Sequence, residues 1–225
     1  MRFVLAFLFL ALGANGASAQ NEVYDPEPPR GSAYLRFVNG LGAPVEIRPD
    51  FGPSLRLGIG GGERVAAYRT VERVQGRALA VEVREGTRSV RATLSAPADG
   101  FVTVIVHAGT DGVPRISTII EEMNFNRARV RVGFYNAFAG CAAASLRVEP
   151  DGPSIFDGVP PGEGRQRTVN PVRAQVRATC PNGGGAGLAL EGLEAGASFS
   201  TWLVSGPDGR PAAFLSRDVT TPWRR

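Results

Sequence analysis

The sequence predicts an all-β protein built from two tandem β-sandwich domains that are related by internal duplication. Short strand-like runs recur between turn signals at the spacing typical of sandwiches, and no window longer than about ten residues keeps a helical period. Three motifs of the first half return in the same order about 97 to 100 residues later. The repeated motifs are Phe37 to Asn39 with Phe134 to Asn136, Gly52-Pro53-Ser54 with Gly152-Pro153-Ser154, and Gly109 to Pro114 with Gly206 to Pro211.

The first domain is expected to span residues 33–123. Its first strand begins at Ala33–Phe37 and ends at the turn signal Asn39-Gly40. In Leu79–Arg84 the apolar residues alternate with charged ones, which indicates a half-buried strand. Phe101–Val106 is almost continuously apolar and predicts a central strand. The remaining expected strands are Val45–Arg48, Arg64–Tyr68, Ser89–Leu94 and Ile116–Ile120.

The second domain is expected to span residues 124–225, after a linker near Met123–Arg127. Its first strand alternates as well, because Val130, Val132 and Phe134 share one face. The other face carries Arg127, Arg129 and Arg131. This alternation again predicts a strand whose two faces lie in different environments.

The first 32 residues are not expected to belong to either sandwich. Arg2, the apolar run Phe3–Leu12 and the small residues Ala17-Ser18-Ala19 form the pattern of a secretory signal peptide over residues 1–19. The apolar run is too short for a bilayer, which needs about 20 residues. Residues 20–32 are rich in proline and predict an extended lead. We therefore expect a protein that is exported and cleaved near Ala19.

Cys141 and Cys180 are the only cysteines and lie in the second half. In an exported protein an even pair predicts a disulfide, which would stabilise that half by roughly 3–4 kcal/mol in the chain-entropy model. The alternative is two independent buried thiols. Two cysteines and one histidine are too few and too scattered for a structural zinc site, so we expect no metal and no cofactor.

No catalytic motif is visible. His107 is the single histidine; it ends an apolar strand, and no serine stands in a G-x-S-x-G elbow. The interpretation favoured here is a histidine at a strand end that faces solvent or a neighbouring strand. We therefore expect no catalytic residues and no enzymatic activity.

The arginines are the main candidates for contacts with other molecules. All basic residues are arginine, and the segment from Asn124 onward contains 12 arginines and 8 acidic residues. Because the charges are mixed in sign without a polybasic block, nucleic acid is an unsuitable partner. Guanidinium groups bind carboxylates bidentately, so Arg129, Arg131, Arg173 and Arg177 could contact an acidic partner or an anionic polymer. The alternative is an ordinary solvated strand face.

The lead and first strand resemble the start of the AlgF family of periplasmic alginate O-acetylation proteins. The residues that match are Tyr24, Pro26, Pro29, Gly31, Ser32, Tyr34, Arg36 and Asn39. In the second half, Val130-Arg131-Val132 and Asn170-Pro171-Val172 are also similar to family strands, with Arg173 at the position of a family lysine. Asp25 replaces a frequent glycine, and the cysteine pair and the absence of lysine are further departures.

The resemblance implies a non-catalytic adaptor that docks onto periplasmic O-acetyltransferases and helps to acetylate alginate or a similar secreted polysaccharide, beside a membrane complex. We expect partner contacts at Tyr24, Pro26 and Arg36 and at the arginines of the second domain. Two other functions remain open: a module that binds an anionic polysaccharide directly, and a chaperone-like or structural envelope protein.

Overall fold

The computed structural model describes residues 27–122 and 126–224. Nearly all regular structure in these ranges is β-strand, and the one helix among them is the short 3-10 turn η1 (Gly61–Glu63). The expected lead residues Tyr24 and Pro26, the signal segment and part of the expected linker lie outside the described residues. No helix of the described ranges is long and apolar enough to cross a membrane.

Domain 1 is a sandwich of two four-stranded sheets, in the orders β4-β1-β7-β8 and β3-β2-β5-β6. Strands β1 and β7 run parallel, and the other pairings are antiparallel. The strands are β1 (Ala33–Asn39), β2 (Val45–Pro49), β3 (Leu55–Leu57), β4 (Arg69–Val71), β5 (Leu79–Glu85), β6 (Arg88–Leu94), β7 (Phe101–Ala108) and β8 (Pro114–Glu121).

Domain 2 repeats this topology, in the orders β12-β9-β15-β16 and β11-β10-β13-β14, again with a parallel pair, β9 and β15. The prediction of two duplicated sandwiches is therefore confirmed. The strands are β9 (Val130–Asn136), β10 (Ala144–Val148), β11 (Ser154–Val159), β12 (Glu163–Val169), β13 (Ala174–Thr179), β14 (Gly185–Leu190), β15 (Ser198–Ser205) and β16 (Pro211–Arg217).

One expected strand was wrong in position. Within residues 64–68 only Val65 and Tyr68 form isolated bridges, and β4 begins at Arg69. The three-residue strand β3 was not predicted, because so short a segment shows too little alternation to be recognised.

The two asparagines of the repeat have the same structural role. Asn39 donates from Nδ2 to the carbonyls of Ala43 and Gly58, and its Oδ1 accepts from the Leu41 amide. Asn136 makes the equivalent bonds with Cys141, Val159 and Phe138. A buried carboxamide thus holds the loop after the first strand of each domain, since buried backbone groups need partners.

The disulfide between Cys141 and Cys180 is present, with Cα atoms 5.2 Å apart. It joins the loop after β9 to the end of β13 and lies in the core of domain 2. The alternative of two separate thiols is excluded.

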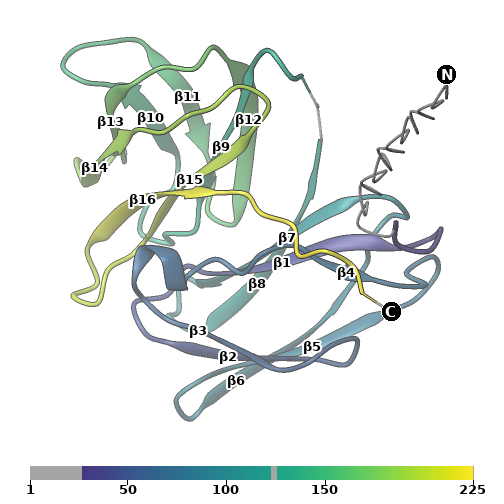
Figure 1. The fold of residues 1–225 in the computed structure, drawn as a ribbon. Coiled ribbons are helices and arrows are strands. Elements are labelled where there is room, and N and C mark those ends of the chain that lie inside the picture. Colours follow the sequence, from purple (N-terminus) through teal and green to yellow (C-terminus); the bar gives the residue numbers. More distant parts are fainter. Residues whose placement is uncertain (1–26, 123–125, 225) are drawn as a thin grey trace, which may run out of the picture.

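The two sandwiches stack through equivalent sheets, so that the sheets containing β1 and β9 meet at the centre of the molecule (Figure 1). A third apolar cluster, distinct from the two sandwich cores, fills this boundary with Val38, Ile105, Tyr135, Trp202 and Val204 among its members. The four central strands β1, β7, β9 and β15 are therefore buried on both faces. This explains why Phe101–Val106 is almost continuously apolar, as expected of a central strand.

The stacking brings equivalent backbone segments together. Gly40 and Ala137 are 97 residues apart in the sequence, and a Cβ built on Gly40 would lie 2.6 Å from the Cβ of Ala137. Only glycine permits this approach. Contact between equivalent positions is expected where two copies of a domain are related by an approximate two-fold axis.

The chain returns to domain 1 after β16. Tyr68 exchanges backbone hydrogen bonds with Val219 and Thr221 at the outer edge of β4. Further along, the indole nitrogen of Trp223 donates to Glu72, 3.0 Å away. The final residues of the chain therefore bind both domains together.

Candidate functional site

A cluster of charged residues lies buried at the boundary between the two domains. Its carboxylates, Glu121 and Asp218, occupy equivalent places in the repeat, 97 residues apart, just at or after the last strand of each domain. Each accepts a hydrogen bond from a hydroxyl of the neighbouring strand: Thr103 donates to Glu121, and Ser200 donates to Asp218 over 2.7 Å. Duplication has thus placed two carboxylates beside one another.

Two arginines bridge the carboxylates. Arg36 of β1 is 2.5 Å from Asp218 and 3.4 Å from Glu121. Arg131 of β9 is 2.7 Å from Glu121 and 3.2 Å from Asp218. Each arginine therefore pairs with the acid of its own domain and with that of the other, so the four side chains form one alternating ring of charge across the boundary.

Aromatic rings enclose the Arg36 guanidinium. Its Cζ lies 4.5 Å from the ring centroid of Tyr68, 5.2 Å from Trp202 and 5.7 Å from Tyr135. Tyr135 and Trp202 stack on each other at 4.3 Å. Aromatic faces attract a cation most strongly where water is excluded, so these rings reinforce the ion pairs.

The cluster sets the protonation of its members. Burial by itself lowers the pKa of Arg36, but the attraction of Asp218 and the other acidic groups outweighs it and raises that pKa above its ordinary value. The pKa of Arg131 is raised by the same balance, with Tyr135 and Glu121 as its main attractive partners. Burial, followed by the charge of Glu121, raises the pKa of Tyr135 well above 10. Both arginines and the tyrosine thus keep their protons at any physiological pH.

The cluster holds the groups that acid–base chemistry would need, but it is closed to substrates. The side chains of Arg36 and Glu121 are 1% and 0% exposed. Both oxygens of Glu121 also accept from the Tyr135 hydroxyl, at 2.9 and 2.8 Å. A hollow between η1 and β16 reaches Arg36, yet this guanidinium already donates to Thr103, Ser200 and both acids. The arrangement therefore joins the domains.

The arginines expected to contact a partner fall into two groups. Arg36 and Arg131 were expected on an accessible strand face, but the structure buries both at 1% and 4% exposure. The face of Arg131 alternates with the core face of β9, as predicted, and the other domain covers it. Arg127 and Arg129 were expected on the same strand face, but they lie in the turn before β9. Arg129, Arg173 and Arg177 are exposed, and Arg177 pairs with Glu149 at 2.6 Å.

The sequence interpretation missed Glu121, Asp218, Tyr68 and Tyr135. The signal for the two acids was present, since the same repeat alignment that pairs Gly109 with Gly206 also pairs Glu121 with Asp218. The tyrosines carry no comparable signal, because each belongs to only one of the domains.

His107 lies next to a serine at the domain boundary. Its Nε2 is 2.8 Å from the Ser117 hydroxyl, and its Nδ1 is 3.0 Å from the Ala108 carbonyl. A Cβ built on Gly162 of domain 2 would lie 2.3 Å from Ser117 Oγ and 2.9 Å from His107 Nε2. The loop before β12 therefore covers the pair. Of the two expected environments for His107, solvent or a neighbouring strand, the structure shows the second.

We expect His107 to make the protein less stable in mild acid. Burial lowers the pKa of His107 below 6.5, and Arg115 lowers it further, while the Ala108 carbonyl opposes the shift. The unfolded chain then binds the proton more readily, so stability is complete above pH 6.5 and falls as the pH drops below that value. Urea unfolding midpoints from pH 7.5 to about pH 5 measure the effect.

The variant His107→Gln separates this histidine from the carboxylates that also titrate in acid. The midpoint of the variant should fall less than that of the wild type over the same pH range. Parallel curves for the two proteins would contradict the assignment.

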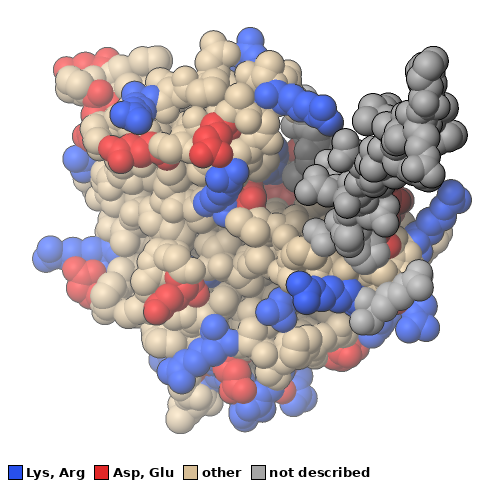
Figure 2. Space-filling model, in the orientation of Figure 1, with Lys and Arg blue, Asp and Glu red and all other residues tan. Residues whose placement is uncertain are grey.

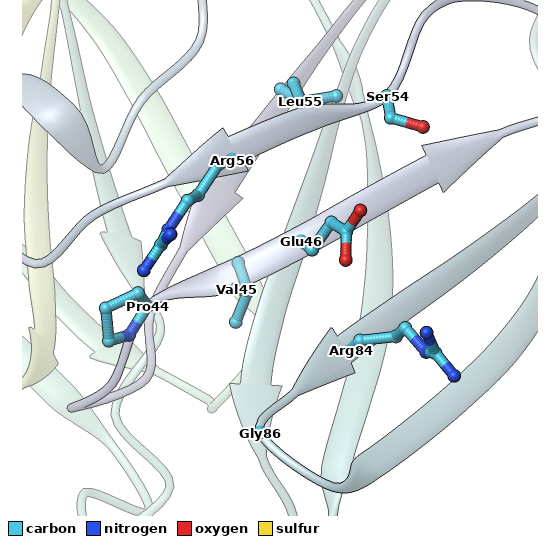
Figure 3. Close-up of a pocket in the computed structure, with 8 residues that line it drawn as sticks. All are labelled: Pro44, Val45, Glu46, Ser54, Leu55, Arg56, Arg84 and Gly86. Atoms are coloured by element: carbon cyan, nitrogen blue, oxygen red, sulfur yellow. The ribbon is translucent and has the colours of Figure 1, made fainter.

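The outer sheet of domain 1 carries a shallow hollow lined by charged side chains (Figure 3). Glu46 lies between Arg56 and Arg84 on neighbouring strands, while its carboxylate pairs with Arg48 at 2.9 Å. Figure 2 shows basic and acidic side chains interspersed over the face in view. Among the described residues no group of three or more histidines, cysteines or acids could hold a metal ion.

In comparisons with known proteins, no family model matches the chain, and no curated protein matches it.

Proposed function

We propose that this protein is a non-catalytic periplasmic adaptor in the O-acetylation of a secreted polysaccharide, alginate or a similar polymer, and that it docks onto the acetyltransferases. The observation that carries the proposal is the sealed charge cluster. It joins the two sandwiches, and its carboxylates and guanidinium groups are buried at the domain boundary. What such a body offers to other molecules is its outer sheets and strand edges.

The resemblance of residues 24–39 to the alginate O-acetylation family supplies the pathway. Of the matching positions, Arg36 lies in the charge cluster and Asn39 holds the loop after β1. These matched residues therefore have structural roles, which supports a shared fold. The partner contacts are then to be sought elsewhere on the molecule.

The proposal is tested by the O-acetyl content of the exopolysaccharide from a strain that lacks the gene. We expect loss of acetyl groups with the polymer yield unchanged, because an adaptor positions transferases and does not build the chain. The matched control is complementation with the wild-type gene, which should restore acetylation. Acetylation that stays at the wild-type level in the deletion strain would overturn the proposal.

Direct binding of an anionic polysaccharide is the second candidate. It is favoured by the outer sheet of domain 2, where Arg147 stands directly opposite Arg177. The equivalent pair in domain 1 is Arg48 and Glu82, of opposite sign. An excess of guanidinium on one sheet suits carboxylate groups, and binding that weakens with salt and is absent for neutral glycans would identify this function.

A further inference from the structure

The two domains differ at one side of the sandwich, where the edge strands of the two sheets face each other. In domain 2 this side is closed. Arg165 and Arg167 of β12 reach across and donate to the carbonyls of Asp157 and Ile155 in β11, at 2.8 and 2.9 Å. Behind them, Phe156 is 6% exposed and belongs to the core.

In domain 1 the same side is open. Arg69 stands opposite Leu35 as Arg167 stands opposite Val132, but the Arg69 side chain makes no hydrogen bond to another described residue. Ala66 and Ala67 occupy the stretch that corresponds to Arg165. Leu55 pairs with Ile47 as Phe156 pairs with Leu146, so a smaller side chain replaces the phenyl ring.

A cavity of about 100 Å³ results between β3 and β4. Apolar side chains provide most of its lining, chiefly Leu35, Phe37, Phe51, Leu55 and Ala66. Figure 3 shows the side chains of Leu55 and Arg56 leaving β3 on different sides, and Leu55 packs against the core of domain 1. A dry cavity of about 150 Å³ admits benzene, so this one matches a single aliphatic side chain.

The surroundings of the cavity favour an extended peptide as its occupant. Within the described part of the chain, strand β3 is hydrogen-bonded only to β2 in its sheet, so no described strand covers its outer edge, and free edges accept added strands. The chain directly before β4 already accepts such a segment, because the Tyr68 backbone forms hydrogen bonds with the chain's own residues Val219 and Thr221. Arg69 is exposed at the mouth of the cavity, and its cation suits a carboxylate.

We propose that the opening between β3 and β4 of domain 1 is a docking site for an extended segment of a partner protein. The segment inserts one aliphatic side chain into the cavity and places an acidic residue, two positions away on the same face, against Arg69. The inference rests on the proposed adaptor function only for the identity of the partner. Domain 2 cannot bind in this way, because its own arginines fill the site.

The test uses synthetic eight-residue peptides of the form Ser-Thr-Val-Thr-X-Thr-Asp-Thr, with Val, Leu or Ile at X. Titration into the isotope-labelled mature protein is followed by amide chemical shifts. We expect shifts that concentrate in β3, β4 and residues 49–53 for at least one peptide. The control peptides carry Ser at X, or Asn in place of Asp, and should bind more weakly.

Variants of the protein test the same site from the other side. Ala66→Leu and Leu55→Phe each fill the cavity and should weaken binding at least about tenfold, since the anchor loses its apolar contact. Arg69→Gln should weaken binding and remove its salt dependence. The matched control is Arg167→Gln, the equivalent change in domain 2, which should leave binding unchanged. Two cavity-filling variants are used so that one remains informative if the other unfolds.

Three results in solution would overturn the proposal. The first is no binding by any peptide up to 2 mM, and the second is equal binding by the cavity-filled variants. The third is self-association in sedimentation that Ala66→Leu abolishes, because the occupant would then be a second copy of this chain. A test in the bacterium separates the docking site from the adaptor function. If deletion of the gene abolishes acetylation but both cavity-filled variants restore it fully, the docking site is rejected and the adaptor function is retained.

Discussion

Replacing Arg36 with alanine is expected to lower the free energy of unfolding by about 3–5 kcal/mol, the cost of leaving buried charges without their partner. Asp218 and Glu121 would keep Arg131 alone as counter-ion, in a site where the carboxylate of Glu121 is 0% exposed. The aromatic cage of Tyr68, Tyr135 and Trp202 would lose its cation as well. Because the cluster spans both domains, the variant should also loosen their association.

Equilibrium unfolding in urea measures the change, with near-ultraviolet circular dichroism as a probe of the stacked Tyr135 and Trp202. The matched control is Arg48→Ala, which breaks an exposed pair with Glu46 whose side chains are both 43% exposed. Exposed pairs contribute less than about 1 kcal/mol, so the control should remain close to the wild type. An Arg36→Ala variant as stable as this control would show that the cluster does not hold the domains together.

Removing the disulfide is expected to destabilise domain 2 by about 4 kcal/mol. Cys141 and Cys180 are 39 residues apart, and the loss of loop-closure entropy for a loop of about that length gives this value in the chain-entropy model. The double variant Cys141→Ala and Cys180→Ala avoids a free thiol. Both cysteines lie in the apolar core, so replacing them with alanine also removes the packing contacts of the two sulfur atoms.

Hydrogen exchange locates the effect. Amides of β10 and β13, whose strands lie next to the bridge, should exchange faster in the double variant. Amides of β2 and β5 occupy the equivalent places in domain 1, which has no disulfide, and should keep more of their protection. Equal losses in both domains would instead mean that the molecule unfolds only as a whole, and that the bridge stabilises domain 1 through the domain boundary.

The sequence by itself determined the class of the fold and its duplication. Alternation with period two is a local property, so it identified strands such as Leu79–Glu85 and Val130–Asn136. Repeated turn motifs revealed two copies of one topology. The cysteine pair was also recoverable, because an even number of cysteines in one half leaves a single intramolecular pairing.

Only the tertiary structure decided what covers each face. Alternation correctly separated Arg131 from Val132, yet it could not reveal that the face of Arg131 meets a second sheet. Arg36 finds Asp218 across 182 residues of sequence, and no local pattern encodes a contact over that distance. The open side of domain 1 depends likewise on how far β3 and β4 extend and on which side chains cross the gap. Packing between elements decides these features, and periodicity records only the two faces of each strand.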